Sequence, residues 1–350
     1  MNSLYGASVS AGVRKFADSH ALVFNIKAVC DCYLPEKIST QVAELLISLI
    51  TEPNVCEGAF DAEVVELERV NLKKQIKAYV NDKSAYADKR CIEIMCEGDN
   101  YATDVNGSPE MLDTITPESL YEHYVDILKN SELDVFLCGN VDVENIKSAF
   151  EVLSSNGKVP LPSAFKKEYE LKEVEENMEV TQGKLVMGFR SDFSENSDRC
   201  RMMVFNGLFG GTATSKLFNN VREKLSLAYY ANTRLNLSKG IIIARSGIEF
   251  SKYQAVREEI MKQLGEIGKG NISEEEMQNT KAHLINVYSS LEDDPESTVA
   301  LKSGWIAEGE TRNVSDIIEG IKNVTKDEVI ECARSLKLCT VYFLKGEQQI

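Results

Sequence analysis

The sequence predicts an α+β protein of two homologous domains, each a mixed, mostly antiparallel sheet with helices packed on one face. The first indication is two strand pairs, which are rich in β-branched and aromatic residues and bounded by turn formers. They are residues 8–13 with 21–29, and residues 228–235 with 240–248. Amphipathic helix patterns follow each pair. The same order of elements occurs twice, roughly 210 residues apart, which indicates an internal duplication.

Two helices are expected after each strand pair. In the first copy, residues 38–49 place apolar side chains at helical spacing, and residues 256–267 do so in the second. The next helix begins at an acidic stretch, at Asp61 in the first copy and after Ser273 in the second. Glu276 stands three residues after Ser273, which is the spacing of a capping box. The two copies therefore agree in helix order as well as in strand order.

Each copy is expected to end with a further helix and a closing strand. Thr116 and Thr325 stand where these helices would begin. The closing strands are predicted at residues 133–138 and 339–344, which are both rich in apolar residues.

A polar, proline-bearing stretch separates the two copies. It covers residues 154–167, and Pro160 and Pro162 would interrupt helix and sheet alike. We therefore expect an N-terminal domain over residues 1–153, a linker, and a C-terminal domain over residues 168–350.

Composition and charge narrow the function. The chain has 350 residues, 43% of them hydrophobic and 27% charged, which is the balance of a soluble globular protein. Its formal net charge is −16, so nucleic acid and anionic membranes are expected to be poor partners. No apolar run approaches the ~20 residues that span a bilayer, and the N-terminus lacks the pattern of a signal peptide. A cytoplasmic location is expected.

The cysteines favour reduced thiols over a disulfide framework. There are nine, an odd number in a long chain without a secretory pattern. Cys30 and Cys32 are separated by one residue, which is too tight for a zinc knuckle or a thioredoxin-type motif.

Patterns for catalysis and for metal binding are missing from the sequence. The three histidines, His20, His123 and His283, have no second histidine at helical spacing. A G-x-S-x-G elbow is also missing. The glycine-rich segment 207–216 lacks the Gly-Lys-Ser/Thr ending of a phosphate loop, and its glycines are expected to let the chain turn between two helices. We predict no catalytic residue and no metal ligand.

Residues 208–229, LFGGTATSKLFNNVREKLSLAY, resemble the signature of the C-terminal domain of insulinase-type zinc peptidases, which include pitrilysin and mitochondrial processing peptidase. The resemblance covers essentially the whole chain, and it implies duplicated α+β domains of about this size. In the family, an Arg and a Tyr seven residues later hold main-chain carbonyls of a bound peptide. These positions are Arg222 and Tyr229 here, so the resemblance implies that both bind substrate.

The sequence departs from the family where the zinc ligands would stand. Active members carry H-x-x-E-H on a helix and a Glu ligand on a later helix, in an E-R-x-x-x-x-x-E segment. Residues 68–75 match that segment, but Gln75 replaces the ligand Glu, and a neutral amide is a poor ligand for Zn²⁺. The H-x-x-E-H helix is missing, and residues 4–7 resemble the segment that follows it. The N-terminal domain is therefore expected to lack its first elements, and the zinc cofactor of the family is not expected.

The resemblance implies a non-catalytic insulinase-family subunit that binds substrate peptide beside an active zinc peptidase, or that pairs with itself. Exposed apolar residues on the first helix, Leu45, Leu46 and Leu49, would favour such association. One alternative is a purely structural interaction subunit. Another is a zinc endopeptidase whose catalytic N-terminal segment is absent from this chain.

Overall fold

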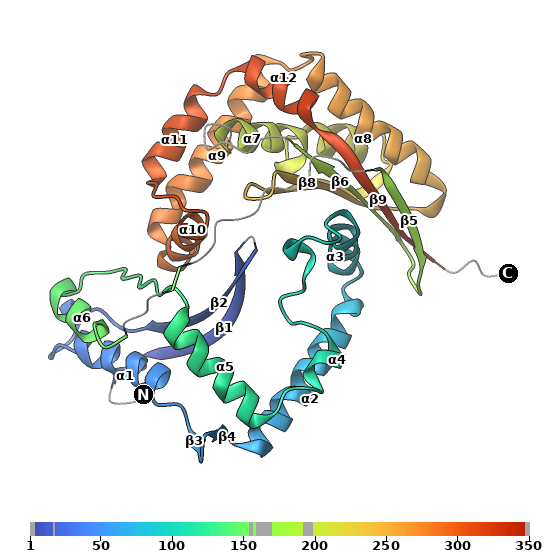
Figure 1. The fold of residues 1–350 in the computed structure, drawn as a ribbon. Helices are drawn as coiled ribbons and strands as arrows, with labels where there is room; N and C mark the ends of the chain where they lie inside the picture. Colours follow the sequence, from blue (N-terminus) through green and yellow to red (C-terminus); the bar gives the residue numbers. More distant parts are fainter. Residues whose placement is uncertain (1–3, 17, 154–156, 159–169, 192–198, 347–350) are drawn as a thin grey trace. The chain divides into compact units, whose positions relative to one another are not determined.

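The computed structural model describes residues 4–16, 18–153, 157–158, 170–191 and 199–346 (Figure 1). The described residues belong to two compact units, each with its own contacts. Unit 1 comprises Met1–Lys77, Asp104–Leu161 and Pro295–Glu310, and unit 2 comprises Ala78–Thr103, Pro162–Asp294 and Thr311–Ile350. All but two residues of the predicted linker lie outside the described residues. The predicted domain boundaries stay predictions. Residues 78–103, from the first half of the chain, belong to unit 2, and residues 295–310, from the second half, belong to unit 1.

Unit 1 begins with a two-stranded hairpin, in which β1 (Ser8–Phe16) pairs antiparallel with β2 (Ser19–Lys27). Helix α1 (Ser39–Thr51) follows and packs against α6 (Val143–Phe150). The carboxylate of Asp31 fixes the start of α1, because it accepts hydrogen bonds from the backbone N–H of Ile38 (2.8 Å) and Ser39 (3.1 Å).

The other elements of unit 1 are short strands and helices. They are β3 (Val55–Cys56), β4 (Ala59–Phe60), α2 (Ala62–Ala78), α4 (Pro109–Leu112), α5 (Pro117–Asn130) and α10 (Pro295–Ala307). Arg69 holds α2 against the segment before α5, since its guanidinium donates to the carbonyls of Leu112 (3.0 Å) and Ile115 (2.6 Å). The Arg of the E-R segment therefore has a structural role in this fold.

The predicted closing strand at residues 133–138 is wrong. This segment is irregular, and its apolar side chains Leu133, Val135 and Leu137 are each more than two-fifths exposed. In the described part of unit 1, β1 and β2 pair only with each other, so no neighbouring strand supplies the hydrogen bonds that a closing strand needs.

Unit 2 contains a five-stranded mixed sheet in the order β5-β9-β6-β8-β7, with β7 at one edge. Only the β5–β9 pair is parallel. The strands are β5 (Lys172–Asn177), β6 (Gly183–Arg190), β7 (Ala228–Asn236), β8 (Ile241–Ile248) and β9 (Lys337–Lys345). The predicted strand pair of this half and its closing strand are confirmed, as is the mostly antiparallel sheet.

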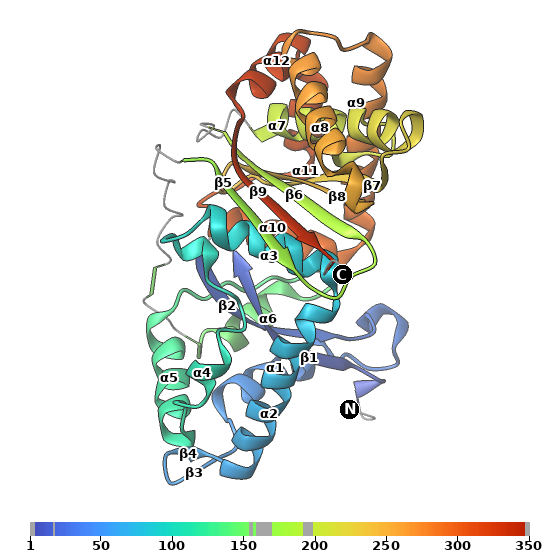
Figure 2. The same ribbon diagram turned by 90° about the vertical axis from the view of Figure 1, so that its right-hand side faces the viewer.

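Helices cover one face of this sheet (Figures 1 and 2). They are α7 (Arg199–Asn206), α8 (Tyr253–Gly268), α9 (Glu274–Ser290), α11 (Val314–Asn323) and α12 (Lys326–Ser335). Phe189 of β6, Phe205 of α7 and Phe209 are almost fully buried beneath them. Their rings meet with centroids 5.6 and 6.3 Å apart, distances at which aromatic pairs attract beyond their buried area. The predicted capping box of Ser273 and Glu276 begins α9 and is confirmed.

Helix α3 (Lys83–Met95) lies on the opposite face, although it comes from the first half of the sequence. Its side chains Ala87, Cys91 and Met95 are buried in a core shared with Val186 of β6 and Tyr342 of β9. This docking was not predicted, because an amphipathic pattern shows that a helix has a buried face and does not show which sheet covers it.

Candidate functional site

Arg222 and Tyr229 lie at the junction between a helix and the edge strand of unit 2. Arg222 belongs to a short π-helical segment, Phe218–Lys224, and such segments are frequent at functional sites. Val221, the residue before Arg222, is fully buried and anchors this segment to the core. The chain then reverses, and Tyr229 is the second residue of β7.

Arg222 has donors that protein contacts leave accessible. Its guanidinium carbon lies 4.8 Å from the centre of the Phe218 ring, which orients the group by a cation–π contact. Its Nε lies 3.5 Å from a carboxylate oxygen of Glu223, an ion pair too long for a good hydrogen bond. The Arg222 side chain is 44% exposed. The group is thus held by packing and can still donate to a ligand.

The turn between Arg222 and Tyr229 is strained. Ser226 has φ = 47°, a left-handed conformation that costs a non-glycine residue energy and that clusters at functional sites. Its carbonyl accepts a hydrogen bond from Lys252 Nζ at 3.2 Å. Tyr229 falls at a register shift in the β7–β8 ladder and is 61% exposed. A bulge of this kind can redirect a side chain, and the Tyr229 side chain is exposed to solvent.

A pocket of about 360 Å³ lies along β7. Residues 210–213 form one wall, and Arg222, Tyr230, Asn232 and Arg245 contribute side chains to it. Tyr229 is not among the lining residues. The structure therefore places Arg222 at the pocket and Tyr229, which is exposed, on the edge strand beside it. Sequence reasoning missed Tyr230, Asn232 and Arg245, although the period-two alternation of β7 placed Tyr230 and Asn232 on one face.

The Tyr230 ring is held in place by a close approach to β8. A side chain at Gly247 would bring a Cβ within 2.5 Å of the ring, so glycine is required opposite Tyr230. The Tyr230 hydroxyl lies 3.2 Å from Ser84 Oγ of α3. Burial raises the pKa of Tyr230 above its usual value, so the phenol stays protonated and can act as a donor at neutral pH.

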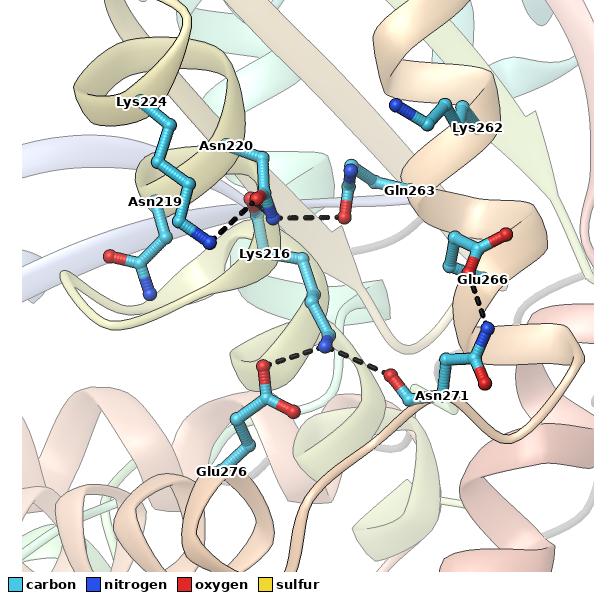
Figure 3. A pocket seen from close by; sticks show the side chains of 9 residues that line it. All are labelled: Lys216, Asn219, Asn220, Lys224, Lys262, Gln263, Glu266, Asn271 and Glu276. Carbon is cyan, nitrogen blue, oxygen red and sulfur yellow. Dashed lines mark hydrogen bonds and ion pairs between the residues drawn. The ribbon is translucent and has the colours of Figure 1, made fainter.

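A second pocket, of about 340 Å³, lies between the π-helical segment, α8 and α9 (Figure 3). Its polar groups bind one another. Lys216 Nζ lies 2.6 Å from Glu276 and 2.9 Å from the carbonyl of Asn271, and Asn220 donates to Gln263 at 3.0 Å. This network holds the π-helical segment, α8 and α9 together.

The residues that the structure describes do not fit a zinc ion. His20, His123 and His283 are exposed on three different elements, and Gln75 is an exposed neutral amide on α2. Among the described residues, no three His, Cys, Asp or Glu side chains converge as zinc ligands must. The described part of the chain also contains no helix that is both long and apolar enough to span a membrane.

The purified chain is therefore expected to contain well below one zinc ion per molecule by elemental analysis after dialysis, and to show no peptidase activity that phenanthroline abolishes. A stoichiometric, dialysis-resistant zinc ion would contradict this. Cys30 and Cys32 would then be the first ligands to test by serine substitution, because their sulfur atoms lie 2.8 Å apart and thiolates bind zinc strongly.

Comparison with known proteins now identifies the class. Residues 114–284 match the family model described as "Peptidase M16 inactive domain". The chain is also 34% identical over 356 aligned residues to "Probable inactive metalloprotease YmfF" of Bacillus subtilis (strain 168), covering 99% of this chain and 83% of that protein. The chain belongs to the M16, or insulinase-like, peptidase family, and both matches support a non-catalytic member.

Two solved structures show the same fold. A conserved protein from Enterococcus faecalis V583 is similar with a TM-score of 0.88 and 29% identity, over 100% of this chain and 84% of that one. A peptidase M16 inactive domain from Pseudomonas fluorescens is similar with a TM-score of 0.74 and 12% identity, over 97% and 81%. The family resemblance seen in the sequence is thus confirmed.

Proposed function

We propose that this protein is a non-catalytic subunit that binds substrate peptide along β7 of unit 2, beside an active zinc peptidase of the same family. The observation that carries the proposal is the position of Arg222. The family motif brings it to a pocket beside an edge strand, with part of its guanidinium exposed.

The chemistry of this region suits an extended peptide. An edge strand offers backbone N–H and C=O groups to which a peptide can add as a further strand. Arg is always charged and presents several donors, and a tyrosine hydroxyl adds another, so Arg222 and Tyr229 suit main-chain carbonyls regardless of the peptide's side chains. Titration of a labelled unfolded peptide into the purified chain tests the proposal.

A purely structural subunit is the second candidate. It is favoured by the contacts of Arg222 with Phe218 and Glu223, which could exist for packing alone. If the protein binds peptide, removal of Arg222 should weaken peptide binding. If the protein is purely structural, removal of Arg222 should lower its stability. The third, a zinc endopeptidase encoded with a further segment, would be supported by an in-frame H-x-x-E-H pattern upstream in the gene.

Association with a catalytic homologue, or with a second copy, is part of the proposal. Unit 1 exposes apolar side chains on its hairpin and on α1, with Val13 at 48%, Leu22 at 39% and Leu49 at 45% exposure. Several such residues on one small unit are typical of an interaction surface.

We expect sedimentation at micromolar concentration to show a dimer, or a complex once an H-x-x-E-H-bearing homologue from the same organism is co-expressed. Val13→Ser combined with Leu49→Ser should shift the equilibrium toward monomer. Val64→Ser on α2, where the side chain is 55% exposed, serves as the control. A monomer that neither binds the homologue nor changes its activity would contradict the proposed partnership.

We also propose that the two halves arose by duplication and that the protein works in the cytoplasm. In both halves, an antiparallel hairpin precedes two helices in the same order, β1-β2-α1-α2 and β7-β8-α8-α9, apart from the short β3–β4 pair. No disulfide is found among the described cysteines, which agrees with a reducing compartment.

A further inference from the structure

The pocket along β7 is positively charged within an acidic protein. Arg222 and Arg245 both line it, and none of its lining residues is Asp or Glu. The chain as a whole carries a formal net charge of −16. A concave site lined by two guanidinium groups attracts negatively charged ligands, even though the protein as a whole is acidic.

Arg245 is oriented by two hydrogen bonds and keeps one edge of its guanidinium for a ligand. Its Nε donates to Asn232 Oδ1 at 2.6 Å, and its Nη1 donates to Asp88 Oδ2 at 2.7 Å. These two hydrogen bonds fix the plane of the guanidinium, and the N–H groups of Nη2 remain to donate to a ligand. A pre-oriented guanidinium loses little entropy when it binds a carboxylate.

The carboxylate of Asp88 does not cancel this charge. Asp88 is 5% exposed and shares its Oδ2 between Arg245 and Arg234, whose Nη1 lies 3.6 Å away. Two arginines thus share a single buried carboxylate, and Arg222 adds a further positive charge to the lining of the pocket.

Glu223 is a further acid near Arg222, but it pairs with Arg222 only at 3.5 Å and is itself more than half exposed. Asp82 lies near the Tyr230 hydroxyl, whose pKa is raised mainly by burial and to a lesser extent by this charge, and Asp82 does not line the pocket.

The opposite wall of the pocket is backbone. A Cβ at Gly210 would approach Thr233 Cγ2 to 2.6 Å, and a Cβ at Gly211 would approach Asn206 Nδ2 to 2.7 Å. Glycine at position 210 lets this wall lie close to β7, and glycine at position 211 lets it lie close to the end of α7. The guanidinium groups of Arg222 and Arg245 line the pocket as well.

We infer that this pocket binds a carboxylate of the peptide, either an Asp or Glu side chain or the C-terminal group. The inference rests on the proposed function, because it gives the chemical preference of the same site. It predicts that the protein selects acidic peptides, whereas main-chain binding by Arg222 and Tyr229 alone would be indifferent to side chains.

The test is fluorescence anisotropy with two pairs of short labelled peptides. The peptides of the first pair differ only in a central Glu or Gln, and those of the second pair differ only in a free or an amidated C-terminus. A carboxylate peptide should bind roughly tenfold more tightly than its neutral match, the effect of one charge-assisted hydrogen bond. The peptide pair that shows the difference in affinity identifies the bound carboxylate as a side chain or as the C-terminal group. Raising the salt concentration should reduce the preference.

Single variants distinguish a loss of carboxylate binding from a loss of folding. Arg222→Gln should reduce the preference to within about twofold, as the loss of a charged donor implies, while Arg14→Gln, on exposed β1, should leave it unchanged. Asp88→Asn removes the competing carboxylate and should tighten binding of the acidic peptide, a gain that damaged folding cannot produce. Equal affinity for charged and neutral peptides would overturn this inference and leave peptide binding standing. Failure of every peptide to bind would overturn both.

Discussion

Replacing Glu176 by alanine is expected to lower the free energy of unfolding by about 2–4 kcal/mol, the cost of removing one partner from a hydrogen-bonded charge pair. Glu176 accepts hydrogen bonds from Arg90 Nε (3.0 Å) and Nη2 (2.8 Å), and from the hydroxyls of Tyr342 (2.8 Å) and Tyr86 (3.1 Å). Its loss leaves the charge of Arg90 and the hydroxyl of the fully buried Tyr342 without their acceptor. This cluster joins α3 to β5 and β9, so α3 should loosen first.

Urea unfolding at neutral pH measures the change. The neighbouring Glu175→Ala is the matched control, because Glu175 is half exposed and pairs only with Lys345 among the residues described. An exposed ion pair of this kind contributes at most about 1 kcal/mol. If both variants cost the same, the docking of α3 does not depend on Glu176.

The stabilisation by Glu176 should depend on pH in a defined direction. Burial alone would raise its pKa, but the hydrogen bonds from Arg90, Tyr342 and Tyr86 outweigh burial, and the pKa of Glu176 lies below its usual value. A lowered pKa in the folded state means that the contribution is complete above the unfolded-state pKa, about 4.3 for Glu, and is lost as the pH falls through the folded value. The difference between wild type and Glu176→Ala should therefore shrink in acid, and a constant difference would contradict this assignment.

Replacing Arg222 by Ala and Tyr229 by Phe together is expected to weaken peptide binding by roughly 10–100-fold, the loss of one or two good hydrogen bonds to the ligand. Tyr229 is 61% exposed, and Arg222 is 44% exposed and contacts Phe218 and Glu223, which are close to it in sequence, so the thermal midpoint should move little. Anisotropy with a labelled peptide measures the first quantity, and thermal unfolding followed by circular dichroism measures the second.

Arg334→Ala is the control, since Arg334 is an exposed arginine on α12 that donates to the carbonyl of Gly268. It should leave peptide affinity unchanged. A double variant that unfolds would favour the structural candidate, and unchanged affinity would remove Arg222 and Tyr229 from the proposed site.

Much of unit 2 could be predicted because its signals are local. The alternation along β7 and β8, the capping box at Ser273 and the apolar spacing in α8 each determine an element within a few residues. The family motif also led to Arg222. These are properties of neighbouring residues, which a single sequence contains.

Long-range pairing could not be predicted in the same way. Residues 133–138 have the composition of a strand, but a strand also needs a partner, and none of the described strands pairs with them. The pairing of Asp88 with Arg245 joins residues 157 positions apart. No local pattern marks such a pair, so the charge of the pocket became visible only in the fold.

Native mass spectrometry of the purified chain with an unfolded acidic peptide tests the central claim most directly, because one spectrum reports bound metal, bound peptide and peptide cleavage together. We predict the mass of the zinc-free chain, alone or paired, carrying one intact peptide per chain. A zinc adduct accompanied by peptide fragments, or the absence of any peptide complex, would contradict the account of a non-catalytic, peptide-binding member of this family.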